Sequence, residues 1–256
     1  MKISPNARYR SRVAEGPADI EAAQRLRYLC FIAETGADAS GARADGRDSD
    51  PFDGVCQHVL IEDTQTDELV GAFRLMALPN GKGIARSYSA QFYALDGLAA
   101  YQGAMVEMGR FCIAPGKGHP DILRVAWAEM ARFVDATDTQ LLFGCSSFQG
   151  CEADAYLEAF TLLADRHLAP RRWRPRIKAP SVFRFAERLR RRQPDAKRAL
   201  LQVPPLLRSY LSMGGWVSDH AVVDRDLGTL HVFTGLEIAK MPQARKRALR
   251  AIAGAT

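Results

Sequence analysis

The sequence predicts a mixed α/β fold in which helices pack on both faces of a twisted, mostly antiparallel sheet. The first observation is the order of elements, in which a helix and two neighbouring strands precede a strand–helix–strand–helix run and a late strand. The second is composition, because 47% apolar and 25% charged residues are an ordinary balance for a globular protein. The third is length, since 256 residues can bury a sizeable core, and we expect a single domain over residues 1–256.

Each element of the N-terminal half has a local signal. A proline and an aspartate, both typical of a helix start, predict a helix over residues 18–32. Residues 35–54 are rich in Gly, Ala and Asp, which indicates a long loop. Residues 55–63 and 68–76 are strand-like and flank a short turn, so together they predict a β-hairpin.

The C-terminal half alternates strands and helices. Short apolar runs bounded by Gly, Pro or polar residues indicate strands, whereas apolar residues at 3.6-residue spacing indicate helices. We therefore expect strands at residues 105–113, 141–145 and 230–238, and helices at residues 121–136, 154–167 and 204–213.

The net charge of +6 is unevenly distributed. A basic segment, residues 171–198, holds twelve Lys/Arg and two acidic residues, and a basic C-terminal tail, residues 240–256, holds five Lys/Arg and no acid. Such segments attract anionic partners. Trp173, Phe183 and Phe185 lie among the arginines, a pattern typical of contact with anionic lipid. A solvated helix face is the alternative, and no motif indicates nucleic acid.

The sequence also bears on compartment and metal content. The first residues are polar and lack an apolar signal segment, and no apolar run is long enough to span a bilayer. Five cysteines without a Cys-x-x-Cys pair favour a reducing compartment, so we expect a cytoplasmic protein. Cys56 and His58 share a strand face but have no second pair of ligands, so no metal site is expected.

Four short motifs hold the residues best suited to chemistry. They are Arg27-x-x-x-Phe31, a loop ending in Asp50-Pro-Phe-Asp53, Gly-Ala-Phe-Arg74 and Glu107-Met-Gly-Arg110-Phe111. This ordered set resembles the Gcn5-related N-acyltransferase (GNAT) superfamily, in the branch shared by acyl-homoserine-lactone synthases and ornithine Nα-acyltransferases. Further stretches resemble the ornithine enzymes in particular, at residues 31–37, 142–148, 204–211 and 219–225.

The resemblance implies an acyltransferase that moves a 3-hydroxyacyl chain from acyl carrier protein to the α-amine of L-ornithine. The product would be lyso-ornithine lipid, in ornithine lipid biosynthesis, and no cofactor is implied beyond the phosphopantetheine arm of the carrier protein. Segment 171–198 would then dock the acidic carrier protein or contact an anionic membrane. Two alternatives stay open: an acyl-homoserine-lactone synthase, although the Trp that those enzymes use with S-adenosylmethionine is missing after Phe31, and a non-catalytic, haemolysin-like membrane-associated protein.

Glu107 is the candidate catalytic base. An α-amine is protonated near neutral pH and must lose a proton before it attacks a thioester, and a carboxylate among apolar residues can accept that proton. The alternative is a structural ion pair with Arg74 or Arg110. Because alternation along a strand puts Glu107 and Arg110 on opposite faces, a shared site requires a bulge, which we predict near residues 108–109.

The candidate substrate-binding residues share charge or aromatic character: Arg27, Phe31, Asp50, Asp53, Arg74 and Arg110. Arg27 or Arg74 would clamp the ornithine carboxylate through two parallel hydrogen bonds, and Asp50 and Asp53 would hold the side-chain ammonium. The aromatic rings, including Phe52, would line the acyl or substrate pocket. A solvated acidic surface and plain core packing are the alternatives for the aspartates and the aromatic residues.

Backbone groups are expected to handle the remaining charges. The developing oxyanion would accept hydrogen bonds from the backbone N–H groups of Phe111, Cys112 and Ile113. A glycine loop containing Gly116 and Gly118 precedes a predicted helix, and amides at a helix N-terminus bind phosphate. We therefore expect this loop to hold the phosphate of the phosphopantetheine arm.

Overall fold

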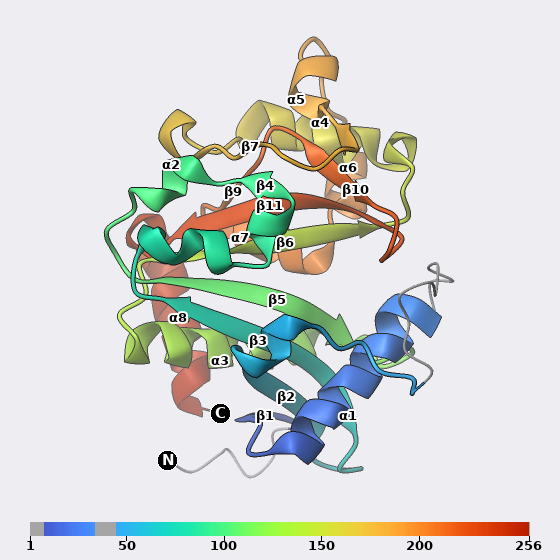
Figure 1. The fold of residues 1–256 in the computed structure, drawn as a ribbon, viewed down its shortest axis with the longest axis vertical. Coiled ribbons are helices and arrows are strands. Elements are labelled where there is room, and N and C mark those ends of the chain that lie inside the picture. Colours follow the sequence, from blue (N-terminus) through green and yellow to red (C-terminus); the bar gives the residue numbers. More distant parts are fainter. Residues whose placement is uncertain (1–7, 34–44, 256) are drawn as a thin grey trace. The chain divides into compact units, whose positions relative to one another are not determined.

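The computed structural model describes residues 8–33 and 45–255, and the chain forms two compact units. Within the described residues, the first unit comprises residues 8–33, 45–77, 108–139 and 242–255, and the second comprises residues 78–107 and 140–241. Both units are mixed α/β structures whose strands are mostly antiparallel and flanked by helices, as predicted (Figure 1).

The strands of the first unit follow the order β1-β2-β3-β5, and they are β1 (Tyr9–Val13), β2 (Gln57–Asp63), β3 (Leu69–Leu78) and β5 (Met105–Ile113). The predicted hairpin is β2–β3, with Val59 opposite Phe73. Strand β1, which the sequence analysis missed, pairs antiparallel with β2. Its alternate residues Arg10 and Arg12 pair with Glu62, so a charged strand is stabilised by ion pairs that no apolar pattern reveals.

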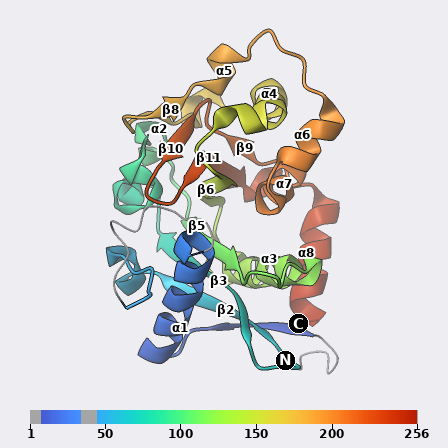
Figure 2. The same ribbon diagram turned by 90° about the vertical axis from the view of Figure 1, so that its right-hand side faces the viewer.

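Helices cover both faces of these strands (Figure 2): α1 (Pro17–Tyr28), continued by a π-helical turn at Leu29–Ala33, α3 (Pro120–Ala136) and α8 (Gln243–Ala255). On one face, Ala23 and Leu26 of α1 pack against Ala72 of β3. On the other, Ile122 of α3 lies over Gly71, where an added Cβ would meet its side chain at 3.4 Å. Helix α8, which was not predicted, packs on α3.

The strands of the second unit follow the order β5-β6-β11-β10-β8, and they include β6 (Leu141–Gln149), β11 (Thr229–Glu237), β10 (Ala221–Asp224) and β8 (Val182–Phe183). The first residues of β5, Met105–Glu107, run parallel to β6, whereas the other pairings are antiparallel. Strand β9 (Trp216–Val217) also pairs with β11. Strands β4 (Tyr93–Ala94) and β7 (Arg176–Ile177) form a separate pair.

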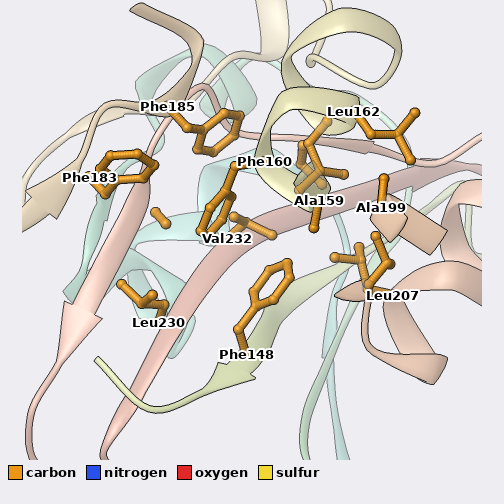
Figure 3. Close-up of a cluster of buried hydrophobic side chains, with 14 residues drawn as sticks. Phe148, Ala159, Phe160, Leu162, Phe183, Phe185, Ala199, Leu207, Leu230 and Val232 are labelled. Carbon is orange, nitrogen blue, oxygen red and sulfur yellow. The ribbon is translucent and has the colours of Figure 1, made fainter. Parts of the chain in front are cut away.

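The core of the second unit is built around Phe160 (Figure 3). It gathers side chains from the strands and from α4 (Leu157–Arg166), α5 (Phe185–Arg188), α6 (Ala196–Gln202) and α7 (Pro205–Ser212). Phe183 and Phe185 belong to this core, so the idea that they face a lipid headgroup region is wrong. Both rings pack on Phe160. An aromatic residue beside arginines in the sequence can belong to a core as well as to an interface, so the pattern alone does not distinguish the two.

Three further details refine the sequence expectations. Residues 35–44 of the predicted loop lie outside the described residues, and the remainder contains a 3-10 turn at Pro51–Gly54. A 3-10 helix at Gly81–Arg86 follows β3, and two more short elements come after it, a 3-10 turn at Ser89–Gln91 and α2 (Asp96–Ala99). Among the helices that the structure describes, none is both long and apolar enough to cross a lipid bilayer.

Candidate active site

Three arginines and three aspartates of the first unit form one network of charged hydrogen bonds, called here the Arg–Asp network. Helix α1 contributes one member, the loop and 3-10 turn before β2 contribute three, and β3 and β5 contribute one each: Arg27, Asp48, Asp50, Asp53, Arg74 and Arg110. All of these residues except Asp48 are predicted from the sequence as site residues.

Arg27 is the most deeply buried member, with 1% of its surface exposed. Its Nη1 and Nη2 donate to the two carboxylate oxygens of Asp53 at 2.8 and 2.9 Å, and its Nε donates to Asp48 Oδ2 at 3.0 Å. Nη2 also donates to the Asp48 carbonyl oxygen. All three guanidinium nitrogens of Arg27 therefore donate hydrogen bonds. The bidentate ion pair with Asp53, a strong type of charged hydrogen bond, holds the acidic loop against α1.

Arg74 and Arg110 hold the other side of the acidic loop. Arg74 Nη1 donates to Asp50 Oδ1 and to Asp53 Oδ1, both at 2.7 Å, and Nη2 donates to Asp50 Oδ2 at 2.7 Å. The Arg74 guanidinium also lies 5.5 Å from the centre of the Phe52 ring. Arg110 lies 3.2 Å from Asp48 and 3.3 Å from Asp50. The aspartates therefore bind arginines and are not a solvated surface cluster.

The local sequence explains how two aspartates come to face the arginines. Asp50 begins the 3-10 turn, where its side chain accepts a hydrogen bond from the backbone N–H of Phe52 at 2.9 Å. Asp53 reciprocates by accepting from the N–H of Asp50, and Pro51 occupies the first turn, where its missing N–H costs nothing. This capping box fixes both carboxylates at one end of the turn.

The arginines control the ionisation of these carboxylates. Burial alone favours the neutral acid, but hydrogen bonds from Arg27 lower the pKa of Asp53 well below its ordinary value. Burial likewise opposes ionisation of Asp50, and the hydrogen bond from Arg74 lowers its pKa. All three aspartates accept from guanidinium groups, so the network matches three arginines with three aspartates.

Strand β5 is irregular at Arg110, whose φ of +54° places a non-glycine residue in the left-handed region. This position comes immediately after residues 108–109, near which the sequence predicts a bulge. A side chain at such a φ is strained unless its surroundings hold it, and here Asp48 and Asp50 do so. The departure from extended backbone interrupts the alternation that would otherwise fix the direction of the Arg110 side chain.

Glu107 belongs to the second unit, where it is buried with 4% of its surface exposed. Its Oε2 accepts from the backbone N–H of Tyr88 at 2.8 Å. Its Oε1 accepts from the backbone N–H of Ser89 at 2.7 Å and from the Ser89 hydroxyl at 2.5 Å. Three donors aimed at two oxygens fix the orientation of the carboxylate and stabilise its negative charge.

Two more side chains complete the surroundings of Glu107. The Ser89 hydroxyl lies 3.4 Å from the Cys145 sulfur on β6. Burial first, and then the charge of Glu107, raise the pKa of Tyr210 on α7, so this phenol keeps its proton at neutral pH. Tyr88 and Ser89 were not predicted, because backbone donors and a single hydroxyl in a short turn leave no periodic or motif signal. Cys145 and Tyr210 lie in the stretches 142–148 and 204–211 that resemble the ornithine enzymes, but the sequence assigned them no role in the site.

The aromatic and backbone candidates occupy less distinctive positions. Phe31 packs against the apolar cluster between α1 and the sheet, as the core-packing alternative expected. Phe111 lies beside Phe73, with ring centres 6.1 Å apart, and Cys112 is buried. The Ile113 carbonyl accepts from the Cys30 thiol at 3.3 Å. An oxyanion-binding role for the backbone N–H groups of residues 111–113 stays a prediction.

The glycine loop before α3 is exposed. Gly116 has a φ of +72°, which glycine adopts without strain, and Lys117 pairs with Glu68 across the loop. Helix α3 begins at Pro120, and the ring of His119 accepts from the next backbone N–H, that of Asp121. Phosphate binding by Gly116 and Gly118 therefore stays a prediction, and it would involve loop amides that precede the helix.

Metal ligands do not gather in the parts of the chain that the structure describes, where no group of three or more His, Cys, Asp or Glu side chains has a suitable arrangement. His58, half of the Cys–His pair noted in the sequence, is buried, and its Nε2 lies 3.1 Å from the carbonyl oxygen of Asp53. Burial lowers the pKa of His58, which favours the neutral imidazole beside the Arg–Asp network.

Comparison with known proteins identifies the family. Residues 26–128 match the family model described as Acetyltransferase (GNAT) domain. The chain is 31% identical over 244 residues to the L-ornithine N(alpha)-acyltransferase of Rhodobacter capsulatus, covering 93% of each chain. It is 30% identical over 238 residues to that of Brucella abortus, covering 90% of this chain and 84% of the other.

Solved structures agree on the fold. A CoA-dependent acyl-homoserine lactone synthase, BjaI, solved with SAM and isopentyl-CoA, superposes with a TM-score of 0.51 at 14% identity. The superposition covers 97% of this chain and 90% of the synthase. This likeness shows a shared fold, and the relatives of higher identity show the branch within it. The chain therefore belongs to the L-ornithine N(alpha)-acyltransferase family, and it is an acyltransferase with a GNAT-like fold.

Proposed function

We propose that this acyltransferase transfers a 3-hydroxyacyl chain from acyl carrier protein to the α-amine of L-ornithine and so forms lyso-ornithine lipid. The observation that carries the proposal is the 31% identity, over 93% of the chain, to a relative named for ornithine acylation. The proposed donor, the carrier protein with its phosphopantetheine arm, rests on the family resemblance of the motifs, and no further cofactor is proposed.

The proposed reaction is a direct transfer without a covalent enzyme intermediate. Glu107 accepts one proton from the α-ammonium group, directly or through water. The resulting amine attacks the thioester carbonyl, a C–N bond forms, and the C–S bond breaks as the phosphopantetheine sulfur leaves as a thiol with the second proton lost by the nitrogen. The donors from Tyr88 and Ser89 support the role of Glu107, because they hold the carboxylate in its charged form, which is the form that accepts a proton.

The Arg–Asp network is the proposed binding region for the amino acid, and its members divide into two roles. Arg27 and Asp53 are buried and engaged with each other, so they are proposed to hold the acidic loop in place. Asp50 and Arg110 are partly exposed and meet at 3.3 Å, so ornithine can compete for them with less loss of buried pairing. Asp50 would then receive an ammonium of ornithine, and Arg110 its carboxylate.

Acyl-homoserine-lactone synthesis is the less favoured alternative. No Trp occurs between Phe31 and Asp53, where the resemblance places the residue that lactone synthases use with S-adenosylmethionine. The lactone synthase BjaI shares 14% identity with this chain. That likeness supports a common fold and says nothing about the substrate.

We also infer peripheral contact with an anionic membrane through residues 171–198. Their net charge of +10 favours an anionic partner, and the proposed product carries an acyl chain that must end in a lipid phase. The acidic carrier protein is the competing partner for the same charges.

Mass spectrometry of reaction products tests the proposed activity. The purified protein would be mixed with 3-hydroxyacyl carrier protein, S-adenosylmethionine and an equimolar pool of ornithine, lysine and glutamine. We expect the mass of hydroxyacyl-ornithine to appear and to depend on the carrier-bound donor. An acylated lactone, a different acylated amino acid, or no transfer from intact donor by folded protein would each contradict the proposal.

A further inference from the structure

Helix α6 has two apolar faces, although only one is needed for packing. Ala199 points into the core of the second unit (Figure 3), and Val203, just beyond the helix, is also buried there. Leu200 and Leu201 lie outside that core, with 50% and 77% of their surfaces exposed. Leu201 is the most exposed large apolar side chain among the described residues. Adjacent exposed leucines on one short helix indicate a contact that folding of this chain does not supply.

Many cations lie close to the two leucines along the chain. Residues 188–201 contain six Lys/Arg and one acidic residue, Asp195. Arg190, Arg191 and Lys197 are exposed and form no ion pair within the described part of the chain. Arg208 of α7 joins them, because its Nη1 donates to the Leu200 carbonyl oxygen at 3.1 Å. The positive charge here is therefore available to an external partner.

The loop that precedes α6 is anchored to the body of the second unit. Glu158 of α4, which is buried, accepts from Arg192 and from the backbone N–H of Asp195. The Asp195 side chain in turn caps α6 by accepting from the backbone N–H groups of Lys197 and Arg198 at 3.0 and 3.1 Å. Helix α6 also packs on α4 (Figure 2). The leucines and cations are thus presented from a fixed base.

We propose that this region, the α6 surface, docks on an anionic lipid bilayer through Arg190, Arg191, Lys197, Leu200, Leu201 and Arg208. The inference rests on the membrane contact proposed above and assigns it to particular residues, three of which (Leu200, Leu201 and Arg208) lie outside the basic segment. The leucines enter the boundary between headgroups and acyl chains, while the surrounding cations bind lipid phosphates. Each cation close to an anionic surface strengthens binding about fivefold.

The chemistry of the α6 surface favours lipid over an acidic protein. A bilayer offers an apolar layer directly beneath a sheet of negative charge, which matches apolar side chains that project among cations. Charge alone would serve an acidic carrier protein and would leave Leu200 and Leu201 unexplained. The same contact would place the enzyme where an acylated amino acid can pass into the membrane.

Co-sedimentation with vesicles of phosphatidylglycerol and phosphatidylcholine tests the role of the leucines. The double variant Leu200→Ser, Leu201→Ser should partition at least about tenfold less than the unchanged protein, because both apolar contacts are lost. The matched control is Ile177→Ser, which removes a 40% exposed apolar side chain from another part of the basic segment and should bind as the unchanged protein does.

A second pair of variants tests the cations. Arg190→Gln, Arg191→Gln should weaken vesicle binding about tenfold or more at low salt, and high salt should remove most of the difference. Arg171→Gln, Arg172→Gln makes the same change of charge in the same basic segment but away from α6, and should have the smaller effect.

The outcomes separate this inference from the membrane contact on which it rests. If the unchanged protein does not bind anionic vesicles, both fail. If the unchanged protein binds and the Leu200/Leu201 variant binds equally well, membrane contact stands and its assignment to the α6 surface is wrong. The same conclusion follows if the Ile177 or Arg171/Arg172 controls lose as much vesicle binding as the α6 variants. If the same α6 variants instead weaken binding of carrier protein while vesicle binding is unchanged, the surface docks protein and the inference is overturned. Transfer from soluble donor should persist in every α6 variant.

Discussion

At Glu107, the proposed base is tested by a substitution that keeps the size of the side chain. Glu107→Gln retains an acceptor oxygen for one backbone donor but removes the ability to accept a proton from the amine. We expect kcat to fall at least about a hundredfold, with a much smaller change in the KM for ornithine. Steady-state kinetics with carrier-bound donor measures both, and a rate within about threefold of the unchanged enzyme would rule out general-base catalysis by Glu107.

Ser89 is expected to act through Glu107. Ser89→Ala removes the hydroxyl donor at 2.5 Å and leaves both backbone donors in place. Losing a donor to the charged form makes the carboxylate easier to protonate, so the acidic limb of the kcat/KM profile should move to higher pH. Ser87→Ala is the matched control, because the Ser87 hydroxyl donates to the Ile84 carbonyl and accepts from the backbone N–H of Ala90. An equal shift of the acidic limb in both variants would show that Ser89 does not act through the ionisation of Glu107.

At the scale of elements, the Arg–Asp network joins a helix, a loop and two strands. Arg27→Met would leave the buried carboxylates of Asp48 and Asp53 short of donors, so we expect the free energy of unfolding to fall by about 3–5 kcal/mol. Arg25→Met in the same helix removes an exposed pair with Glu21, worth about 0.3–0.5 kcal/mol. Urea unfolding at neutral pH compares the two, and equal losses would contradict a structural role for Arg27.

The same network predicts a pH dependence of stability. The pKa values of Asp50 and Asp53 are lowered in the folded protein, so their contribution is complete above the unfolded value of about 4 and is lost as pH falls below it. The Arg27→Met variant should lose less stability than the unchanged protein over that acidic range. Unfolding curves collected at a series of pH values test this, and parallel losses in the two proteins would argue against it.

Sequence patterns predicted some elements better than others for identifiable reasons. The β2–β3 hairpin, β5 and α3 combine apolar residues at the right spacing with clear boundaries, and the structure confirms them. Strand β1 and helix α8 are rich in arginine, and their stability comes from contacts with β2 and α3 that a local window does not contain. Within the site, charged motifs indicated most of the arginines and aspartates. The hydrogen-bond donors to Glu107 come from a separate turn, so they could be identified only from the three-dimensional structure.

At the scale of the whole molecule, the charge distribution predicts how the reaction rate with two different acyl donors depends on salt concentration. The acidic carrier protein is attracted over distances comparable with the Debye length, so kcat/KM for the carrier-bound donor should fall several-fold as salt rises. A small uncharged pantetheine thioester carries no such attraction and serves as the matched donor. Initial rates across a salt series test the difference, and identical salt slopes for the two donors would exclude electrostatic docking of the carrier protein.

The Arg–Asp network also constrains how this protein can change over time. Because Asp53 is shared by Arg27 and Arg74, and Asp50 by Arg74 and Arg110, one substitution removes one of two partners from more than one buried or half-buried charge. The cost of a second substitution then depends strongly on the first, so effects at these positions are not additive. Viable evolutionary routes through this region must therefore alter opposite charges together.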